Sequence, residues 1–203
     1  MPRDKTENHQ KIMVAAYEEF MEFGFMKSSM RHIGKRCGLT ASGIYRHCID
    51  KEDLFAQVVA PAIDRINHWL DAHVNYYLEA VQRKENLYWR DSEIDMMREI
   101  IYPHMDEYYL LLVKSQGSRY DHFLNDLIIK NQKQLLSYLP VLKEQGYAPW
   151  NVDEKSLHLL LSAYMTSLFE PVLHRYSLDE ALHCLKIVEE FFLPSWKKLL
   201  GFK

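Results

Sequence analysis

Most of the short motifs that mark catalytic or cofactor sites are missing from this chain of 203 residues. It has no G-x-S-x-G, no phosphate-cradling glycine loop, no H-E-x-x-H and no C-x-x-C, and it contains only seven glycines. His68 and His73 are five residues apart, the wrong step for one helical face, and Glu170 with His174 makes a single i,i+4 pair. We therefore expect no enzyme activity, no metal and no cofactor. A metal sensor or an enzyme built on a helical bundle is the alternative.

Cysteines and long apolar runs are also scarce. Cys37, Cys48 and Cys184 are odd in number and lack any paired spacing, which is typical of buried thiols in a reducing cytoplasm; a thiol redox switch is the alternative. No signal peptide is visible at the N-terminus. The uncharged run at residues 156–169 has 14 residues, fewer than the about 20 that a bilayer span needs. We expect a cytoplasmic protein that does not enter a membrane.

Strand-like alternation and internal repeats are absent as well, and the apolar residues follow a helical period instead. From His9 to Phe25 they recur at three- and four-residue steps, which predicts an amphipathic helix that ends at Gly24. A polar loop is expected at residues 82–86. Further helices are expected at residues 94–102, 104–114, 120–139, 154–176 and 178–200. The predicted fold class is all-α.

Two short helices joined by a tight turn are predicted near the N-terminus. Ser28 or Ser29 is suited to cap the first helix, and Gly38 is suited to end it in a left-handed conformation. Thr40 is suited to cap a second helix at residues 41–48. This spacing matches a helix-turn-helix.

The second of these helices is predicted to present one face to the core and the other to solvent. Ile44 and Cys48 are four residues apart and should pack inward. Side chains that can donate hydrogen bonds remain on the outer face: Thr40, Ser42, Tyr45, Arg46 and His47. We interpret this helix as the one that reads a nucleic acid.

Positive charge is concentrated on this segment. Residues 27–51 hold six Lys or Arg against one acid, Asp50, a net charge of +5, whereas the whole chain carries −3. The rest of the chain therefore carries −8, and a local cationic excess of this kind is expected where phosphates are neutralised. The alternative is that these charges only solvate the surface of a small helical unit.

A fourth helix should connect the first helices to the rest of the chain. Asp50 is placed to cap it, and Asp53 follows in its first turn. Pro61 removes one backbone donor, so we expect a kink or a break there. Residues 1–8 are polar and are expected to form a mobile arm.

The uncharged run at residues 156–169 needs cover on all sides, which a single bundle seldom provides. We predict that a second copy covers it, in a two-fold interface formed by the last two helices. A core helix covered within one chain is the alternative. The final helix would contribute Ala181, Leu182, Leu185, Val188 and Phe192.

Aromatic residues are abundant, with 13 Tyr, 9 Phe and 4 Trp. Most should form the core, but Tyr and Trp carry polar tips that suit a pocket for a small, partly apolar ligand. For any one residue a place in the core is the alternative. The predicted ligand-binding residues are Trp69, His73, Tyr77, Tyr102, Tyr109, Phe123 and Tyr164.

The N-terminal residues carry a family pattern. The chain reads Ile12-x-x-Ala15-Ala16-x-x-x-Phe20-x-x-x-Gly24-Phe25, Ser29-Met30-Arg31-x-Ile33, Gly38-Leu39-Thr40, Gly43-Ile44-Tyr45-x-His47 and Lys51-Glu52-x-Leu54. Over roughly residues 10–56 it resembles the N-terminal domain of the TetR (tetracycline-repressor-like) family of bacterial transcription regulators. Departures from that pattern are His32 in place of an acid, Gly34 in place of Ala, and Cys48 in place of an aromatic residue.

This resemblance implies a homodimeric repressor that binds a palindromic operator in double-stranded DNA and is released by an unidentified small-molecule effector. The implied domains are a helix-turn-helix DNA-binding domain at 1–56 and a larger helical bundle for ligand binding and dimerisation at 57–203. Some relatives activate transcription. The alternative function is a helical protein-interaction module whose helix-turn-helix has lost its affinity for DNA.

The resemblance also assigns residues to the DNA interface. It implies that Ser29 and Thr40 cap helices on the phosphate side, that Tyr45, His47 and Lys51 contact the backbone, and that Ser42, Gly43 and Arg46 face base edges. The full predicted DNA-binding set is Ser29, Arg31, Thr40, Ala41, Ser42, Gly43, Tyr45, Arg46, His47 and Lys51.

Overall fold

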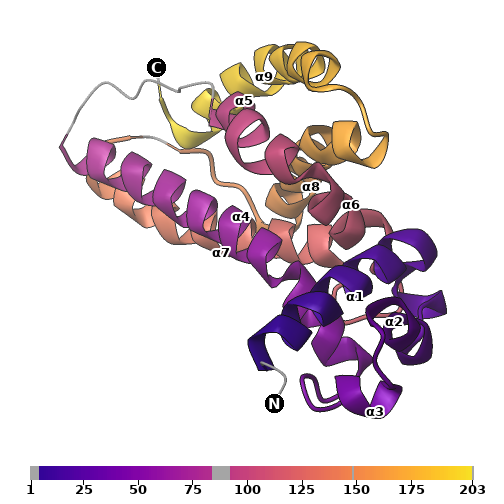
Figure 1. Cartoon of the computed structure of the whole chain (residues 1–203). Coiled ribbons are helices and arrows are strands. Elements are labelled where there is room, and N and C mark those ends of the chain that lie inside the picture. Colours follow the sequence, from indigo (N-terminus) through magenta and orange to yellow (C-terminus); the bar gives the residue numbers. More distant parts are fainter. Residues whose placement is uncertain (1–4, 84–91, 148, 203) are drawn as a thin grey trace. The chain divides into compact units, whose positions relative to one another are not determined.

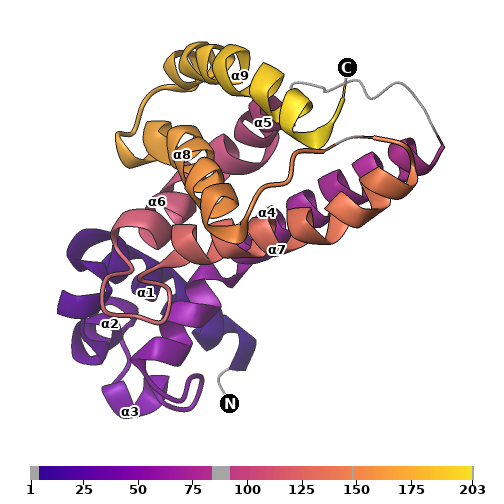
Figure 2. The ribbon, with the colours of Figure 1, turned by 180° about the vertical axis from the view of Figure 1, so that it is seen from behind.

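The computed structural model of the chain describes residues 5–83, 92–147 and 149–202. Every regular element in these ranges is a helix, as Figure 1 and the reverse view in Figure 2 show. The all-α class predicted from the sequence is therefore confirmed.

The helices form two compact units. Unit 1 contains the described residues of 1–65 together with 104–122, and unit 2 contains those of 66–103 and 123–203. The domain boundary expected between residues 56 and 57 stays a prediction. The sequence did not indicate that the segment 104–122 packs with the N-terminal helices.

Unit 1 begins with the helices that the sequence predicted. The first starts at Lys5 rather than at His9, so the expected arm is helical from residue 5, and residues 1–4 lie outside the described part. The helices are α1 (Lys5–Lys27), α2 (Met30–Cys37), α3 (Ala41–Ile44) and the first half of α4 (Lys51–Gln82).

The helix predicted to end at Gly24 kinks there, at φ 72°, and α1 continues to Lys27. The ends of α2 and the start of α4 are set by local hydrogen bonds at the predicted residues. The Ser29 side chain accepts from the His32 backbone N–H at 3.1 Å. Gly38 ends α2 in the left-handed region at φ 70°. The Asp50 carboxylate accepts from the Asp53 N–H at 2.7 Å and so caps α4.

An aromatic cluster forms the centre of unit 1. The Phe55 ring from α4 lies edge-on to Phe20 and Phe25, with centroids 4.9 and 5.2 Å apart. Tyr120, from the segment after α6, lies 6.0 Å from Phe55. Edge-to-face pairs add about 0.5–1.5 kcal/mol each beyond the area they bury. This cluster therefore joins α1 and α4 to the segment 104–122.

Helix α6 (Met105–Val113) and the residues after it complete unit 1. Tyr108 is fully buried, and its hydroxyl donates to the Ala62 carbonyl of α4 at 3.1 Å. The Phe25 N–H donates to the Lys114 carbonyl at 2.7 Å. Both contacts span a long separation in sequence, which explains why no local pattern predicts them.

Unit 2 is a bundle of the remaining helices. Helices α4 and α7 run side by side in both views (Figures 1 and 2). Helix α8 packs on α7 and α9, and α9 also contacts α5. Between α5 and α6 the chain makes a π-helical turn at Met97–Ile101 and a 3₁₀ turn at Tyr102–His104. The helices that begin in this unit are α5 (Ser92–Met96), α7 (Phe123–Glu144), α8 (Glu154–Leu173) and α9 (Leu178–Leu200).

Prolines interrupt these helices less than the sequence suggested. Helix α4 continues through Pro61 without a break into two segments. Helix α7 continues past Pro140, so it ends at Glu144 rather than at Leu139. Proline removes one donor and strains one turn, and packing along the rest of a long helix can outweigh that cost of about 3 kcal/mol. Most of the loop expected at residues 82–86 lies outside the described part of the chain.

Among the described residues, no helix is long and apolar enough to cross a bilayer. No three of their His, Cys, Asp or Glu side chains are grouped so that they could hold a metal ion.

We predict that Gly34→Ala destabilises the protein although alanine is the better helix former by about 1 kcal/mol. A Cβ at Gly34 would lie 2.7 Å from the Leu39 carbonyl oxygen, a backbone atom that cannot move aside without opening the turn between α2 and α3. Because overpacking of this kind costs about 1–3 kcal/mol and alanine returns about 1 kcal/mol of helix propensity, we expect a net loss of up to about 2 kcal/mol in the free energy of unfolding. Urea titration measures it.

Gly43→Ala is the matched control. A Cβ there would make only ordinary contacts, the nearest at 3.5 Å to the Thr40 hydroxyl oxygen, so its stability should equal or exceed that of the wild type. A Gly34→Ala variant as stable as the wild type would contradict the prediction.

Candidate nucleic-acid interface

Helix α3 is shorter than predicted but keeps the expected faces. The regular helix ends at Ile44, and residues 45–48 continue as turns in which the Cys48 N–H still donates to the Ile44 carbonyl at 3.3 Å. Ile44 and Cys48 are both buried, as the sequence predicted. Burial also raises the pKa of the Cys48 thiol to about 11, so the thiol stays protonated and packs as a small apolar group.

The predicted reading residues lie on the opposite side of α3. Thr40, Ser42 and Arg46 are exposed, and the Tyr45 side chain is 51% exposed. The Thr40 hydroxyl accepts from the Gly43 N–H at 3.1 Å, which confirms it as the cap of α3. These donors therefore face solvent rather than the core.

His47 has a different environment from its neighbours. Its ring is half-buried and stacks on His9 of α1, with centroids 5.9 Å apart. Ala41 and Gly43 are half-buried and belong to α3 itself, and Arg31 is exposed on α2.

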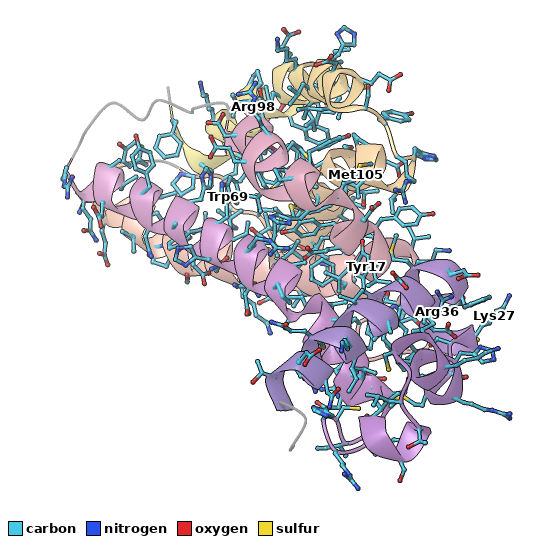
Figure 3. All side chains as sticks on the ribbon, viewed as in Figure 1. Tyr17, Lys27, Arg36, Trp69, Arg98 and Met105 are labelled. Carbon is cyan, nitrogen blue, oxygen red and sulfur yellow. The ribbon has the colours of Figure 1, made fainter. Side chains whose placement is uncertain are left out.

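Arg36 of α2 is held by acids of α1. Its Nε donates to Glu19 at 2.9 Å, and it also pairs with Glu22 and lies 3.6 Å from Glu18. Hydrogen bonds to Glu22 and then to Glu19 raise the pKa of the guanidinium. Figure 3 labels Arg36 on α2 and Lys27 at the end of α1. The guanidinium of Arg36 is therefore paired with acids of the protein itself.

Glu19 is the functional residue that sequence reasoning missed. It is fully buried on α1, and its carboxylate lies 3.4 Å from the Ser29 N–H and 3.3 Å from His32 Nδ1. In a capping box the third helical residue accepts from the N-cap N–H. His32 cannot do this as an acid does, and Glu19 supplies that acceptor from another helix. The sequence did contain a signal for this role, because Glu19 is an acid at a position of the helical period whose neighbours are apolar and face the core.

Lys51 is also committed within unit 1. Its ammonium donates to the carbonyls of Phe25 at 2.7 Å and Ser28 at 3.2 Å, and it lies 4.4 Å from the centre of the Phe25 ring. Burial lowers the pKa of this amine. Lys51 therefore ties the start of α4 to the end of α1, and its predicted contact with phosphate stays a prediction.

Four cations remain available for an anionic partner. Within the described part of the chain, Lys27, Arg31, Lys35 and Arg46 make no ion pair, and all four are exposed. The net charge of +5 counted along the sequence therefore overstates what the surface offers, because it includes committed cations and omits the neighbouring glutamates of α1.

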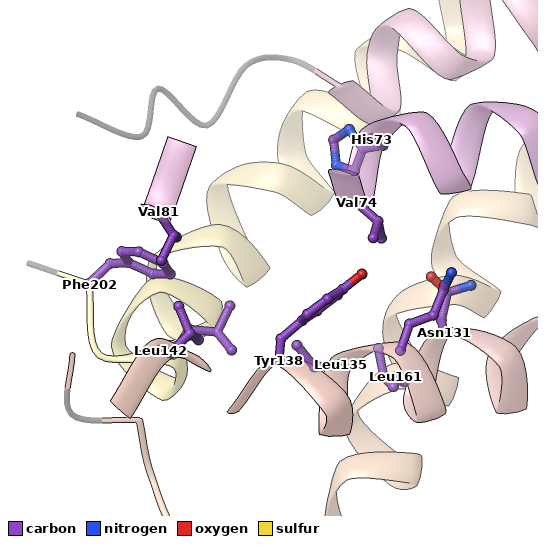
Figure 4. A pocket seen from close by; sticks show the side chains of 11 residues that line it. His73, Val74, Val81, Asn131, Leu135, Tyr138, Leu142, Leu161 and Phe202 are labelled. Carbon is purple, nitrogen blue, oxygen red and sulfur yellow. The ribbon is translucent and has the colours of Figure 1, made fainter. Parts of the chain in front are cut away.

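A separate cavity lies in unit 2, with a volume of about 190 Å³. It is formed by α4, α7, α8 and the end of α9 (Figure 4). Most of its walls are apolar, and no Asp, Glu, Lys or Arg is among the described residues that line it. The lining residues are His73, Val74, Val81, Asn131, Gln134, Leu135, Tyr138, Leu142, Leu161, Leu200 and Phe202.

Of the predicted ligand-binding residues whose side chains the structure describes, His73 is the one that lines this cavity. Trp69 stacks on the outer side of His73, with ring centroids 4.8 Å apart. Tyr102 donates to the Tyr176 carbonyl, and Tyr164 packs against Phe192 and Trp196.

The other predicted ligand residues are dispersed. Phe123 is buried at the start of α7, Tyr109 is half-buried in unit 1, and the side chain of Tyr77 lies outside the described part. Aromatic content could not separate core from cavity, because both need large apolar side chains.

Residues 12–58 match the family model for bacterial regulatory proteins of the tetR family. An HTH-type transcriptional regulator of Staphylococcus aureus strain USA300 is 27% identical over 149 residues, which cover 64% of this chain and 80% of that protein. The same match recurs in a regulator of strain NCTC 8325.

Solved structures share the fold. A Clostridium perfringens protein described as a candidate regulator of fatty acid metabolism has a TM-score of 0.55 at 16% identity, over 89% of this chain and 95% of that one. NalD, the secondary repressor of the MexAB-OprM multidrug efflux pump in Pseudomonas aeruginosa, has a TM-score of 0.50 at 17% identity, over 92% and 97% of the two chains.

We predict opposite effects of His32→Glu in two backgrounds. In the wild type the new carboxylate would face the buried carboxylate of Glu19 and should destabilise α2. In a Glu19→Ala background it would complete the capping box with Ser29 and should restore part of the stability. Glu19→Ala alone should cost about 1–3 kcal/mol of the free energy of unfolding, because it leaves polar partners unpaired.

A double-mutant cycle measured by urea titration tests this coupling. Glu18→Ala serves as the control, since Glu18 is exposed and its loss should change stability by no more than about 0.5 kcal/mol. If His32→Glu has the same sign in both backgrounds, Glu19 does not replace the capping acid.

Proposed function

This chain is a TetR-family transcriptional regulator, and from that premise we propose that it is a ligand-responsive repressor that binds a palindromic operator as a homodimer. The regulators of this family bind DNA operators and act as dimers, and they are not enzymes. Repression, ligand response and the palindrome are the parts that we propose. Because its operator lies on the chromosome, we propose that it acts in the cytoplasm.

The outer side of α3 carries this proposal. Tyr45 and Arg46 project to solvent while Ile44 and Cys48 anchor the same turn in the core. A short helix seated in this way can enter a major groove, where side chains reach base edges. The unpaired cations on α1 and α2 supply the sequence-independent attraction to phosphate. Ser29 and Thr40 cap α2 and α3, and Lys51 ties the start of α4 to the end of α1. All three support the proposal by holding the helices around α3 in place.

A palindromic operator needs two reading heads, and the last two helices offer a surface for dimerisation. Leu159 of α8 is 69% exposed, and Ile187 and Phe191 of α9 are 58% and 75% exposed. Ile187 and Phe191 are four residues apart and so share one face of the helix. By contrast, Ala181 and Leu185, which we expected at the interface, are buried within the protomer. We propose that a second copy covers the exposed set.

Release by a ligand follows from the connection through α4. This helix runs without a break from the DNA-binding unit into the unit that holds the cavity. A ligand that binds one state of unit 2 more tightly would shift the population toward it. We propose that this state changes the spacing of the two heads, so that both no longer fit successive major grooves about 34–36 Å apart.

The main experiment is selection of an operator from random duplexes with the purified wild-type protein. We predict an inverted repeat whose affinity falls steeply with salt, because phosphate contacts release counterions. Arg46→Gln should lower the affinity and relax the base preference at one position of each half-site, because Arg46 is proposed to face base edges. Lys133→Gln, which removes an exposed cation of α7, should change neither.

The same titration distinguishes the repressor from the alternative function. A helical interaction module without DNA affinity would select no sequence and would show no salt slope on any duplex. That result would reject the repressor.

We also predict that Phe191→Glu yields a monomer that no longer binds the operator. It places a charge in the centre of the proposed interface, where desolvation is costly. Glu190→Gln, on the neighbouring exposed position, should leave the dimer intact. Sedimentation velocity measures the mass, and a dimeric Phe191→Glu variant would place the interface elsewhere.

A further inference from the structure

The cavity in unit 2 differs from most regulatory pockets in its size. At about 190 Å³ it is smaller than the about 300–1,000 Å³ of sites for drug-sized ligands. An engineered protein cavity of about 150 Å³ holds one benzene molecule. The present cavity therefore has room for one ring with a short tail.

The polar groups around this cavity are neutral at pH 7. Burial lowers the pKa of His73, so its imidazole carries no charge at neutral pH. Burial also raises the pKa of Tyr138. Asp71, which lies near Tyr138, is paired with Lys130 at 3.1 Å and accepts from Gln134 at 3.1 Å. Among the described residues of the lining, a charged ligand would find no counter-ion.

Two polar groups of the described lining have no hydrogen-bond partner, the buried Gln134 carbonyl oxygen and the Tyr138 hydroxyl. The Asn131 amide already donates to the Leu127 carbonyl at 2.9 Å. The Tyr138 hydroxyl makes no hydrogen bond within the described part of the chain. Figure 4 shows this oxygen pointing into the space that Val74 and Asn131 border. A hydroxyl can donate and accept, so it suits a ligand that carries a hydroxyl of its own.

We propose that this cavity binds uncharged compounds of about one ring that carry a single hydroxyl group, and that the ligand hydroxyl hydrogen-bonds to the hydroxyl of Tyr138. The walls formed by Val74, Leu135, Leu142 and Leu161 bury the apolar body of such a compound. The role of the compound as effector rests on the proposed function above, whereas its binding to the cavity does not.

Three probes of matched size test the ligand class: 4-propylphenol, propylbenzene and 4-propylbenzoate. Isothermal titration of the full chain at pH 7.5, without DNA, measures each dissociation constant. We expect 4-propylphenol to bind about 2- to 10-fold more tightly than propylbenzene, the range that one neutral hydrogen bond supplies. We expect no measurable binding of 4-propylbenzoate, because its carboxylate would be buried without a partner.

Two variants assign the preference to the cavity. Tyr138→Phe removes only the hydroxyl, so the ratio of the two affinities should fall to about 1 while propylbenzene still binds. Tyr176→Phe, an exposed tyrosine of the same unit outside the cavity, should leave the ratio unchanged. Val74→Phe should fill the space and abolish binding of all probes, and circular dichroism confirms that each variant is folded.

Several results would overturn the proposed ligand class. They are equal binding of 4-propylbenzoate and 4-propylphenol, an unchanged ratio in Tyr138→Phe, or no binding of any probe to the wild type. Operator binding by the ligand-free protein is measured in a separate titration. Failure there would reject the proposed repressor, and failure of the probes alone would reject only this ligand class.

Discussion

Contact between three phenylalanine rings decides where the reading helix stands. Phe20 and Phe25 of α1 meet Phe55 of α4, and Tyr120 joins them from the segment after α6. Helices α2 and α3 are too short to be stable alone and take their positions from the two longer helices that this cluster joins. The position of the outer side of α3 therefore depends on the aromatic core behind it. A core of this kind holds the side chains that we propose to face the bases in one orientation.

Charge in unit 1 is divided between internal contacts and the surface. Arg36 and Lys51 hold helices together, the first through the buried carboxylate of Glu19 and the second through backbone carbonyls at the end of α1. The remaining cations face solvent, where Coulomb attraction to phosphate is long-ranged but weakened by salt. Stability thus rests on Arg36 and Lys51, and the proposed affinity for DNA rests on the other cations of the same segment. A count along the sequence cannot separate the two uses, because it ignores which side chains already have partners.

Local features of the fold were predictable because they depend on neighbouring residues. Ser29, Thr40 and Asp50 cap their helices through bonds to residues three positions on, and Gly38 adopts the left-handed conformation that ends α2. Boundaries failed where packing outweighed local preference, as at Pro140, which α7 passes. The ligand-binding set was dispersed for a similar reason. Aromatic residues show no difference in sequence between a core position and a cavity wall.

The sequence by itself determined the all-α class, the helix-turn-helix and the inward face of its second helix, since periodicity, caps and glycines act within a few residues. Only the tertiary structure decided that Glu19 of α1 completes the cap of α2, that residues 104–122 pack in unit 1, and that Tyr138 faces a small apolar cavity. These contacts join residues far apart in the chain. Their formation depends on how whole helices pack, and no local pattern carries that information.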